Sequence, residues 1–407
     1  MKKVIFIVGD GMADRPCREY EFKTPLEVAD RSNLDYLAKK SVTGIVDIIS
    51  PGIPPGTDYA HLAIFGYDPK KYYIGRGPLE ALGVGLTLKP DDVAFRINFA
   101  TVNDNLVVID RRAGMIEDTE ELVKEIHGMT INGVEVIAKK GTAYRGALIL
   151  RGKGLSHEIT DIEAKPGNRI NFSKPLAKND EAKFTADLLN KLFLEIHNKL
   201  KNHSLNLKRE KEGKYPANAI LVRGAGKYKP VDKKFNEKWK MKALCIAGVG
   251  LIKGIARYVG MDILTPEGAT GTLDTDMMVK ARACIENLDR YDFIFVHVKA
   301  MDVASHKGDF EKKVEVIERF DEMIGYIASN VEDAVIVVTA DHTTPIEAKD
   351  HRGDPVPIMI YASNIRVDDV DKFTERACAR GGLCRIRGLD IMPIIADLLN
   401  LTKKHGA

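Results

Sequence analysis

Cysteine is scarce in this chain of 407 residues and follows no pattern. The cysteines are odd in number and form no C-x-x-C pair; they are Cys17, Cys245, Cys284, Cys378 and Cys384. A disulfide framework or a zinc knuckle would need paired, closely spaced cysteines, so neither is indicated. Scattered thiols are typical of a reducing compartment, and we therefore expect a cytoplasmic protein.

A strong charge of one sign and a long apolar run are also missing. The 61 basic and 58 acidic side chains leave a net charge of only +3, which argues against a nucleic-acid partner bound through bulk charge. Near the N-terminus, the apolar run from Val4 to Val8 is interrupted by Gly9 and Asp10, so we interpret it as a strand rather than a signal peptide. No segment is long enough to cross a bilayer, and we expect no membrane partner.

The chain does contain enough residues for a large core, and it shows two kinds of sequence texture. A single core stops growing near about 250 to 300 residues, so this length predicts two domains or one large domain with an insertion. Both ends alternate buried strands with helices, which is typical of an α/β fold with a mainly parallel sheet. Between about residues 76 and 240 the texture changes to glycine-punctuated segments, an alternating strand over 93–102 and a lysine-rich helix over 179–201.

The run AVIVVTADHTTP, residues 334–345, is the centre of the prediction. Its β-branched residues from Val335 to Val338 predict a strand buried on both faces of a parallel sheet. This strand delivers Asp341 and His342 to its carboxyl end, the edge at which open α/β sheets bind ligands. A carboxylate beside an imidazole is a common beginning of a divalent-metal site, so further ligands are expected.

Two other strand ends supply carboxylates in the same way. Asp10 follows the strand from Val4 to Val8, although an aspartate in an isolated Asp-Gly pair often only caps a turn. The strand over 291–298 leads into a segment with Asp302 and His306 four residues apart. A helix there would place both side chains on one face, toward a single metal ion.

Thr57 begins a predicted short helix after a loop rich in proline and glycine. A hydroxyl at a helix N-terminus lies near unpaired N–H groups and the positive end of the helix dipole, which favour an alkoxide and a transferred phosphate. The alternative is that Thr57 is only an N-cap, the commonest role for a threonine there. The local sequence leaves both interpretations open.

Arginines collect near glycine turns in the central stretch: Arg76, Arg96, Arg111, Arg112, Arg145, Arg151 and Arg223. Arginine suits bidentate recognition of carboxylate and phosphate. Most surface arginines are merely solvated, and that reading applies to any one of these taken alone. The run Asp110-Arg111-Arg112 and the residue Arg223 stand out because each follows or lies in an apolar strand that directs its side chains.

Seven groups lie at or near predicted strand ends: Asp10, Thr57, Asp302, His306, Asp341, His342 and His351. Two metal ions need about six protein ligands, mostly carboxylates and imidazoles, with a nucleophile bridging the pair. Histidine is scarce, with 10 residues in the chain, yet three of them belong to this set. We interpret His61 and His297 as packing or supporting groups.

At this point the chain resembles the alkaline phosphatase superfamily and, within it, the archaeal type of cofactor-independent phosphoglycerate mutases. The resemblance covers nearly the whole chain. It depends on an ordered set of motifs: IVGDGM, PPGTDYAHLAIFGYDP with YYIGRGPLEALGVG, DRRAG at 110–114, ILVRGAG, LIKGIARYVGM, the D-x-x-x-H of 302–306, and TADHTTP with His351.

The resemblance implies a metal-binding, phosphatase-like domain of residues 1–75 and 241–407, with helices on both faces of its sheet. Residues 76–240 would form a smaller inserted α+β domain that binds the substrate as a lid. One divalent ion would be held by Asp10, Thr57, Asp341 and His342, and the other by Asp302, His306 and His351. Manganese, magnesium, zinc and cobalt all suit such ligands, so the metal identity stays open.

The resemblance also implies an activity, the interconversion of 2- and 3-phosphoglycerate in glycolysis and gluconeogenesis, without a bisphosphoglycerate cofactor. Thr57 would be the nucleophile where most mutases of this family have serine, and Lys253 would contact the phosphate. Arg111, Arg112, Arg145 and Arg223 would hold the phosphoglycerate, and Asp110 would be the acid/base group.

Two alternative functions remain open at this stage. A hydrolase of the same superfamily would use the same metal ions but let water accept the phosphate. The second alternative is a family member adapted to another phosphorylated metabolite, or a non-catalytic metal-stabilised binding protein. Tight metal binding without formation of a phosphothreonine would favour this alternative. The oligomeric state is also open, although homo-oligomers are common among cytosolic enzymes of this size.

Overall fold

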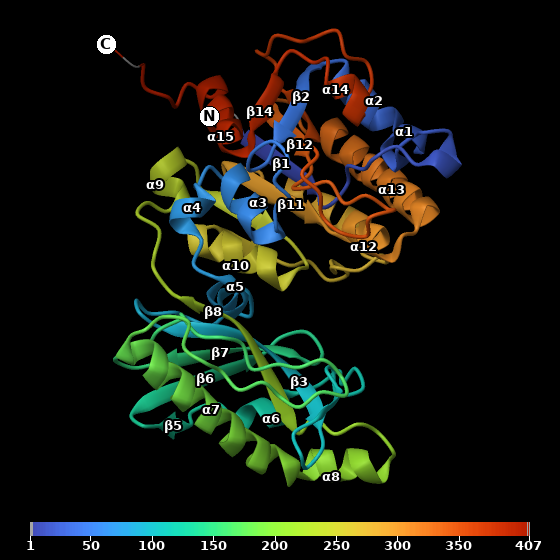
Figure 1. Cartoon of the computed structure of the whole chain (residues 1–407). Coiled ribbons are helices and arrows are strands. Elements are labelled where there is room, and N and C mark those ends of the chain that lie inside the picture. Colours follow the sequence, from blue (N-terminus) through green and yellow to red (C-terminus); the bar gives the residue numbers. More distant parts are fainter. Residues whose placement is uncertain (1–2, 405, 407) are drawn as a thin grey trace. The chain divides into compact units, whose positions relative to one another are not determined.

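The computed structural model describes residues 3–404 and 406, and it divides into two compact units (Figure 1). Unit 1 combines the chain up to Tyr73 with the chain from Val231 onward, and unit 2 is Ile74–Pro230. Residues 231–240, expected in the insertion, lie in unit 1. There the Trp239 Nε1–H donates to the Phe65 carbonyl at 3.0 Å and buried Phe235 joins the aromatic core.

Unit 1 is built on an eight-stranded sheet with the order β10-β9-β11-β1-β12-β13-β2-β14. All strands except β13 run in the same direction. The strands are β1 (Lys3–Gly9), β2 (Ser41–Asp47), β9 (Ala243–Ile246), β10 (Asp262–Leu264), β11 (Phe293–Val298), β12 (Ala334–Thr339), β13 (Val356–Tyr361) and β14 (Cys384–Arg387).

The central strands β11, β1 and β12 lie side by side and are almost entirely buried. Each Val or Ile side chain taken from water there contributes about 1.5 to 3 kcal/mol, which explains the apolar runs. In the parallel register, Gly9 pairs with Val298 and Val8 with Thr339. The three strands therefore end at one edge, and the residues that follow them meet there.

The helices of unit 1 form two groups that cover the faces of the sheet (Figure 1). One group is α1 (Pro25–Val28), α2 (Ser32–Ala38), α11 (Met277–Glu286), α12 (Ala300–Lys307) and α13 (Phe310–Ser329); the other is α3 (Thr57–Ile64), α10 (Gly250–Val259) and α15 (Gly388–Leu398). Short helices at α4 (Pro69–Tyr72), α9 (Phe235–Trp239) and α14 (Glu375–Cys378), with a 3-10 turn at Arg18–Tyr20, complete the unit.

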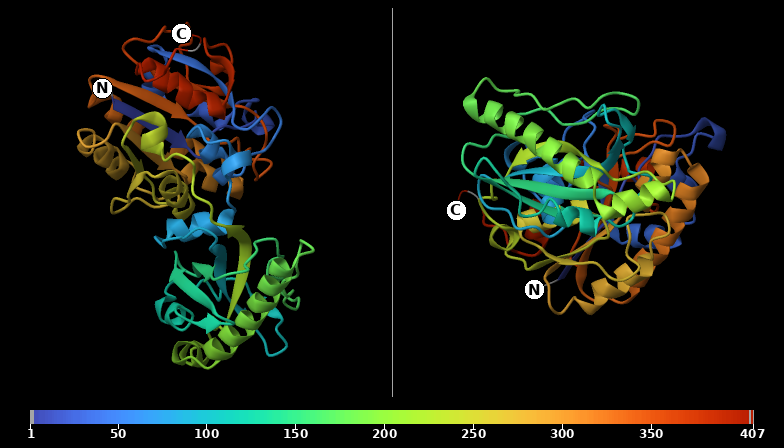
Figure 2. Two further views of the ribbon diagram at one scale, coloured as in Figure 1. Left: turned by 90° about the vertical axis from the view of Figure 1, so that its left-hand side faces the viewer. Right: turned by 90° about the horizontal axis from the view of Figure 1, so that it is seen from below.

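Unit 2 has an antiparallel sheet in which β3 (Val93–Val102) pairs with both β7 (Arg145–Arg151) and β8 (Ala219–Lys227). Its other strands are β4 (Val108–Asp110), β5 (Thr130–Ile131) and β6 (Val134–Lys140), and its helices are α5 (Arg76–Gly83), α6 (Glu120–Lys124), α7 (Asp180–Lys201) and α8 (Ser204–Lys211). The long helix α7 runs along the sheet and packs on β8 (Figure 2).

The expected fold class, an α/β unit with a mainly parallel sheet plus a smaller α+β part, is confirmed. The predicted strands over 4–8 and 93–102 and the predicted helix over 179–201 are also present. The segment around Asp302 and His306 is helical, as the metal-site argument requires. Among the described residues no helix has both the length and the apolar character needed to cross a membrane.

Candidate metal centre

Three parallel strands and their following segments deliver the candidate ligands of unit 1 to one place. Asp10 follows β1, Asp341 and His342 follow β12, and Asp302 lies in α12 directly after β11. All four side chains are almost fully buried. The metal ligands proposed from sequence therefore meet at the carboxyl edge of the sheet, where parallel strands commonly bind ligands.

The first candidate group is Asp10, Asp341 and His342, which offer ligand atoms within 4.8 Å of one another. His342 Nε2 lies 3.5 Å from Asp10 Oδ1 and 3.2 Å from Asp341 Oδ2. Asp341 Oδ1 accepts the Gly11 N–H at 3.1 Å, which fixes the carboxylate. Its Oδ2 is buried and has no hydrogen-bond partner among the described residues, as expected of an oxygen that binds a metal ion.

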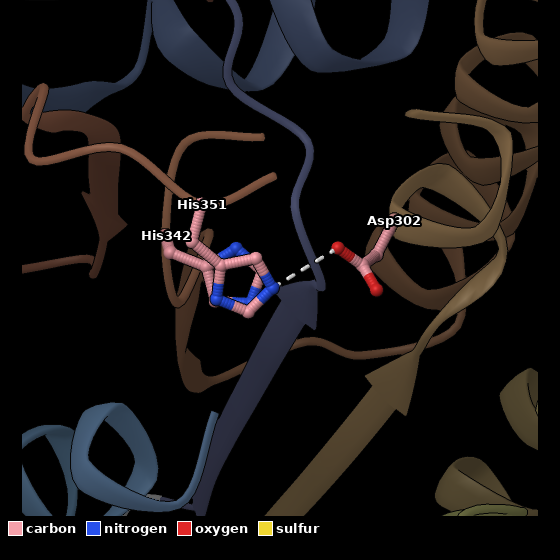
Figure 3. A group of neighbouring side chains, drawn as sticks. All are labelled: Asp302, His342 and His351. Carbon is pink, nitrogen blue, oxygen red and sulfur yellow. Dashed lines mark ion pairs between the residues drawn. The ribbon is translucent and has the colours of Figure 1, made fainter. Parts of the chain in front are cut away.

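The second candidate group is Asp302, His342 and His351, whose side chains point toward one another in Figure 3. His351 Nε2 lies 3.6 Å from Asp302 Oδ1, and His306 Nε2 lies 3.3 Å from the same oxygen. The rings of His342 and His351 are stacked, with centroids 3.5 Å apart. His342 thus lies between the two groups, whereas the sequence assigned it to one metal ion only.

Hydrogen bonds on the far side of each ring set the histidine tautomers. His306 Nδ1 lies 2.8 Å from the Lys349 carbonyl oxygen and His351 Nδ1 lies 2.9 Å from that of Pro55. A carbonyl oxygen can only accept, so each Nδ1 carries a proton. Burial acts against the charge of His351, but Asp302 and the Pro55 carbonyl outweigh it and raise the pKa of His351 to about 9. Without a metal ion the His351 Nε2 is therefore also protonated and pairs with Asp302, and a bound metal ion would replace that proton. Such support from the second ring nitrogen is usual for metal-binding histidine.

Thr344 orients the third histidine. Its hydroxyl donates to Asp302 Oδ1 at 3.1 Å and lies 2.8 Å from His342 Nδ1, so the latter donates its N–H to the hydroxyl. His342 Nε2 lies between Asp10 and Asp341. An imidazole nitrogen facing carboxylates at these distances needs a proton or a metal ion between them, so the donor set fits divalent metal ions.

His61 and His297 lie behind the ligands, as the supporting interpretation requires. His297 Nε2 lies 2.9 Å from Asp10 Oδ2. The His61 Nδ1–H donates to the Thr57 carbonyl at 2.7 Å, and burial lowers the pKa of His61 to about 4, which keeps the ring neutral. Both histidines therefore support the loop and strand ends that hold the candidate ligands.

Lys299 is the functional candidate that the sequence analysis missed. Its Nζ donates to Asp302 Oδ2 at 2.7 Å and to Asp10 Oδ2 at 3.2 Å. Burial alone would lower the pKa of Lys299, but the two carboxylates outweigh burial and hold that pKa above its ordinary value. The only available signal was its position, the first residue after an apolar strand and three residues before Asp302.

Burial acts against the charge of both carboxylates, and their positive neighbours overcome it. The pKa of Asp10 is well below its usual range because Lys299 and His297 outweigh the cost of burial. The pKa of Asp302 is also lowered, against burial and the nearby Asp10 charge, by His351 and Lys299. Both groups are therefore carboxylates at neutral pH, the form that binds metal ions.

Thr57 is the first residue of α3, and the N-cap is Gly56. The threonine hydroxyl is therefore not the helix cap, and the alternative reading of Thr57 is wrong. The Thr57 Oγ1 lies 3.4 Å from His342 Nε2. The structure thus places this hydroxyl beside the first candidate group and at the positive end of a helix dipole.

Lys253 lies in α10, which packs against the Thr57 helix α3. Its side chain is partly buried, and burial and the neighbouring Arg257 lower its pKa. Its placement is compatible with a phosphate contact.

In unit 2, arginines from two paired strands form a compact group. Arg96 of β3 pairs in register with Arg223 of β8. Burial, and then the charge of Arg223, lower the pKa of Arg96 to about 10. Arg223 Nη1 lies 3.4 Å from Glu163 Oε2, and Arg111 Nη2 lies 2.6 Å from the same oxygen. A single carboxylate is thus shared by two guanidinium groups.

The other residues proposed from sequence lie outside the centre of this group. Arg145 and Arg112 lie over the ring of Tyr144, with guanidinium carbons 5.1 and 5.9 Å from its centroid. Asp110 Oδ1 accepts the Arg112 backbone N–H at 2.5 Å, which is the contact of a turn-capping aspartate. The structure therefore gives Asp110 a local structural contact.

Asp161 is a second residue that the sequence analysis missed. Its Oδ1 accepts the Gly224 N–H at 2.9 Å, directly beside Arg223 in the chain. Burial raises the pKa of Asp161, with Glu163 adding to the effect. A raised pKa keeps a larger fraction of the carboxyl group protonated, and only the protonated form can donate a proton.

The comparisons with known proteins agree with this geometry. Residues 2–398 match the family model described as the metalloenzyme superfamily. The chain is 50% identical over 411 residues to 2,3-bisphosphoglycerate-independent phosphoglycerate mutase 1 of Methanocaldococcus jannaschii, covering 100% of this chain and 99% of the relative. It is 48% identical over 410 residues to the enzyme of Methanococcus maripaludis, with both chains fully covered.

Solved structures give the same result. The PH0037 protein from Pyrococcus horikoshii is 41% identical with a TM-score of 0.87, covering 100% of this chain and 99% of that one. The cofactor-independent phosphoglycerate mutase from Thermoplasma acidophilum is 36% identical with a TM-score of 0.73, covering 98% of this chain and 100% of that one. The chain therefore belongs to the archaeal type of 2,3-bisphosphoglycerate-independent phosphoglycerate mutases, within the metalloenzyme (alkaline phosphatase) superfamily.

Proposed function

We propose that this protein interconverts 2-phosphoglycerate and 3-phosphoglycerate in the cytoplasm, without a bisphosphoglycerate cofactor and through a phosphothreonine at Thr57. The observation that carries the proposal is the full-length similarity to curated mutases. The convergence of Asp10, Asp341 and His342 beside the Thr57 hydroxyl supports it. The rest of the scheme follows from the contacts of individual residues.

The two candidate groups would hold two divalent metal ions, with His306 completing the group around Asp302. Bound there, such ions would lower the pKa of the Thr57 hydroxyl and neutralise charge on the phosphoryl oxygens. The protein's own part is to orient the groups. Backbone carbonyls fix His306 and His351, and the Gly11 N–H fixes Asp341.

Thr57 would attack the substrate phosphorus and release the glycerate hydroxyl, and the retained glycerate would then accept the phosphate on its other hydroxyl. With Thr57 as the first residue of α3, the N–H groups of the first helical turn would bind the transferred phosphate. Lys253 on the neighbouring helix α10 would contribute a positive charge to the same phosphate.

Unit 2 would act as the substrate-binding lid that retains the glycerate and excludes water during transfer. Arg96 and Arg223 support this role because two partly buried guanidinium groups face one another across paired strands. Their Nε atoms are buried and have no hydrogen-bond partner among the described residues. An anion such as the glycerate carboxylate would satisfy them and cancel their repulsion. Arg111, Arg112 and Arg145 would complete this anion site.

We expect the metal-reconstituted protein to bind two Mn²⁺ ions per chain, about 3.5 to 4 Å apart, because imidazole and carboxylate atoms that can bind a metal ion converge in two groups. Replacement of His306 or His351 by Ala should leave one strongly bound ion. Metal analysis gives the stoichiometry, and electron paramagnetic resonance detects the spin coupling of a close pair. His157→Ala, at an exposed histidine of unit 2, is the matched control and should keep two ions. A wild-type protein that binds one ion or none contradicts the assignment.

Thr57→Ala should abolish mutase turnover and leave both Mn²⁺ ions bound, because the variant removes the nucleophile and only one of the expected ligands. Thr57→Ser keeps a hydroxyl at the same position and should retain most of the activity. The measurement is a phosphoglycerate interconversion assay, with phosphoenzyme trapped by acid quench. Near-normal turnover in Thr57→Ala would show that the hydroxyl is not the nucleophile.

Arg223→Ala should raise the ratio of phosphate release to phosphate transfer by tenfold or more. A charge-assisted hydrogen bond contributes roughly 1.5 to 3 kcal/mol, so its loss should shorten the time that the glycerate stays bound. Inorganic phosphate and product are measured in the same reaction. The control is Arg169→Ala, an exposed arginine of the same unit. An unchanged ratio of phosphate release to transfer would show that Arg223 does not hold the glycerate. A wild type that mainly releases phosphate would favour the hydrolase alternative.

The acid/base group is either Asp110, as expected from the motif, or Asp161, whose pKa is raised by burial beside Arg223. We expect Asp161→Asn to lower the mutase rate by about 100-fold or more, since general acid–base groups contribute about 10² to 10⁴. Asp110→Asn should cost much less because Asp110 already caps the turn at Arg112. The opposite order of the two rates would restore Asp110 as the acid/base group.

A further inference from the structure

Lys299 links the two candidate metal groups. Its Nζ lies 2.7 Å from Asp302 Oδ2, and 3.3 and 3.2 Å from the two carboxylate oxygens of Asp10. Asp10 belongs to one group and Asp302 to the other. The lysine side chain is 23% exposed, whereas the two carboxylates are 0% and 2% exposed. One ammonium group is therefore shared by two buried carboxylates that belong to different candidate metal groups.

The oxygens of Asp302 are divided between two kinds of partner. Oδ1 faces the Nε2 atoms of His306 and His351, and Oδ2 contacts Lys299. Metal binding through Oδ1 would therefore leave the ammonium contact in place. The partners of the two Asp10 oxygens are separated less clearly. His297 contacts Oδ2 and His342 faces Oδ1, while Lys299 lies near both oxygens. The contacts of Lys299 with Asp302 and Asp10 can therefore persist when metal ions are bound.

The charge of the centre depends on this lysine. Three buried carboxylates, Asp10, Asp302 and Asp341, bring three negative charges, and the histidines are neutral when they bind metal. Two divalent ions add four positive charges, so the loaded centre has one positive charge in excess without Lys299 and two with it. A phosphoryl group near neutral pH is close to a dianion. With Lys299, the centre matches that charge.

We propose that Lys299 is a permanent third cation of this centre, which weakens metal binding and strengthens the binding of the phosphoryl dianion. The proposal rests on the proposed two-metal function. It follows because a fixed positive charge a few ångström from both sites repels divalent cations and attracts the anion, with energies above thermal energy even at an effective dielectric constant of about 20. A lysine that only braced two carboxylates would act differently, since its loss would disorder the ligands and weaken both kinds of binding.

The test compares metal and anion affinities in the full chain. Lys299→Gln removes the charge and keeps a donor that reaches the carboxylates, and Lys299→Met removes both. By isothermal titration, we expect both variants to bind Mn²⁺ at least tenfold more tightly than wild type. The Mn²⁺-loaded variants should bind inorganic phosphate at least tenfold more weakly. Opposite changes of this size, each about 1.4 kcal/mol, are the signature of a charge effect.

Two further variants keep the result interpretable. Lys299→Arg keeps the charge and should stay within about threefold of wild type for both ligands. Lys313→Met is the matched control, because Lys313 is a buried lysine that pairs with Asp14 at 2.8 Å, and Asp14 belongs to neither metal group. Loss of Lys313 is expected to lower the thermal unfolding midpoint without shifting the two affinities in opposite directions.

Three outcomes would overturn the proposal. If Mn²⁺ and phosphate both bind more weakly in Lys299→Gln, the lysine is a brace and not a charge-setting group. If neither affinity changes, its charge is screened and has no role. If the wild type binds no Mn²⁺, the two-metal function itself fails, and this result is distinguished from the others because it appears before any variant is made.

Discussion

The structure of unit 1 depends on one electrostatic constraint, the burial of three carboxylates at the same edge of a parallel sheet. Asp10, Asp302 and Asp341 follow strands that lie side by side, so the fold itself brings their charges together. Like charges at such distances in a buried site repel strongly. This repulsion is reduced by Lys299 and by histidines whose Nε2 atoms face the carboxylates. The negative charge that remains makes the site suited to divalent metal ions.

The hydrogen bonds around the site have a consistent purpose. Each candidate histidine is held by an acceptor on its Nδ1 side, from Lys349, Pro55 or Thr344. These acceptors come from two loops, one before α3 and one between β12 and β13, and all of them turn Nε2 toward the carboxylates. Preorganisation of this kind lowers the cost of assembling ligands when metal ions bind. It also explains why Pro55 and Lys349, which contribute no candidate ligand atom of their own, belong to the site.

Unit 2 has a different electrostatic character. Its paired strands place Arg96 opposite Arg223, and Glu163, Asp161 and Glu80 are the carboxylates near this group of guanidinium side chains. The excess positive charge suits an anion, as the excess negative charge of the protein groups in unit 1 suits cations. A phosphorylated carboxylic acid with metal-bound phosphate combines both requirements, which is the chemical class that the family relationship indicates.

The sequence by itself determined the fold class and the central strands, and it proposed the candidate ligands that the structure brings together. It could do so because β-branched runs report buried parallel strands, and because Asp10, Asp341 and His342 follow such runs directly. Only the tertiary structure decided that His342 lies between both groups, that Lys299 pairs with Asp10 and Asp302, and that Arg96 faces Arg223. These facts depend on strand register and on backbone carbonyls from distant segments, and local sequence patterns contain neither. For the same reason the motif pointed to Asp110, whereas Asp161 was identified only from its raised pKa and its contact with Gly224.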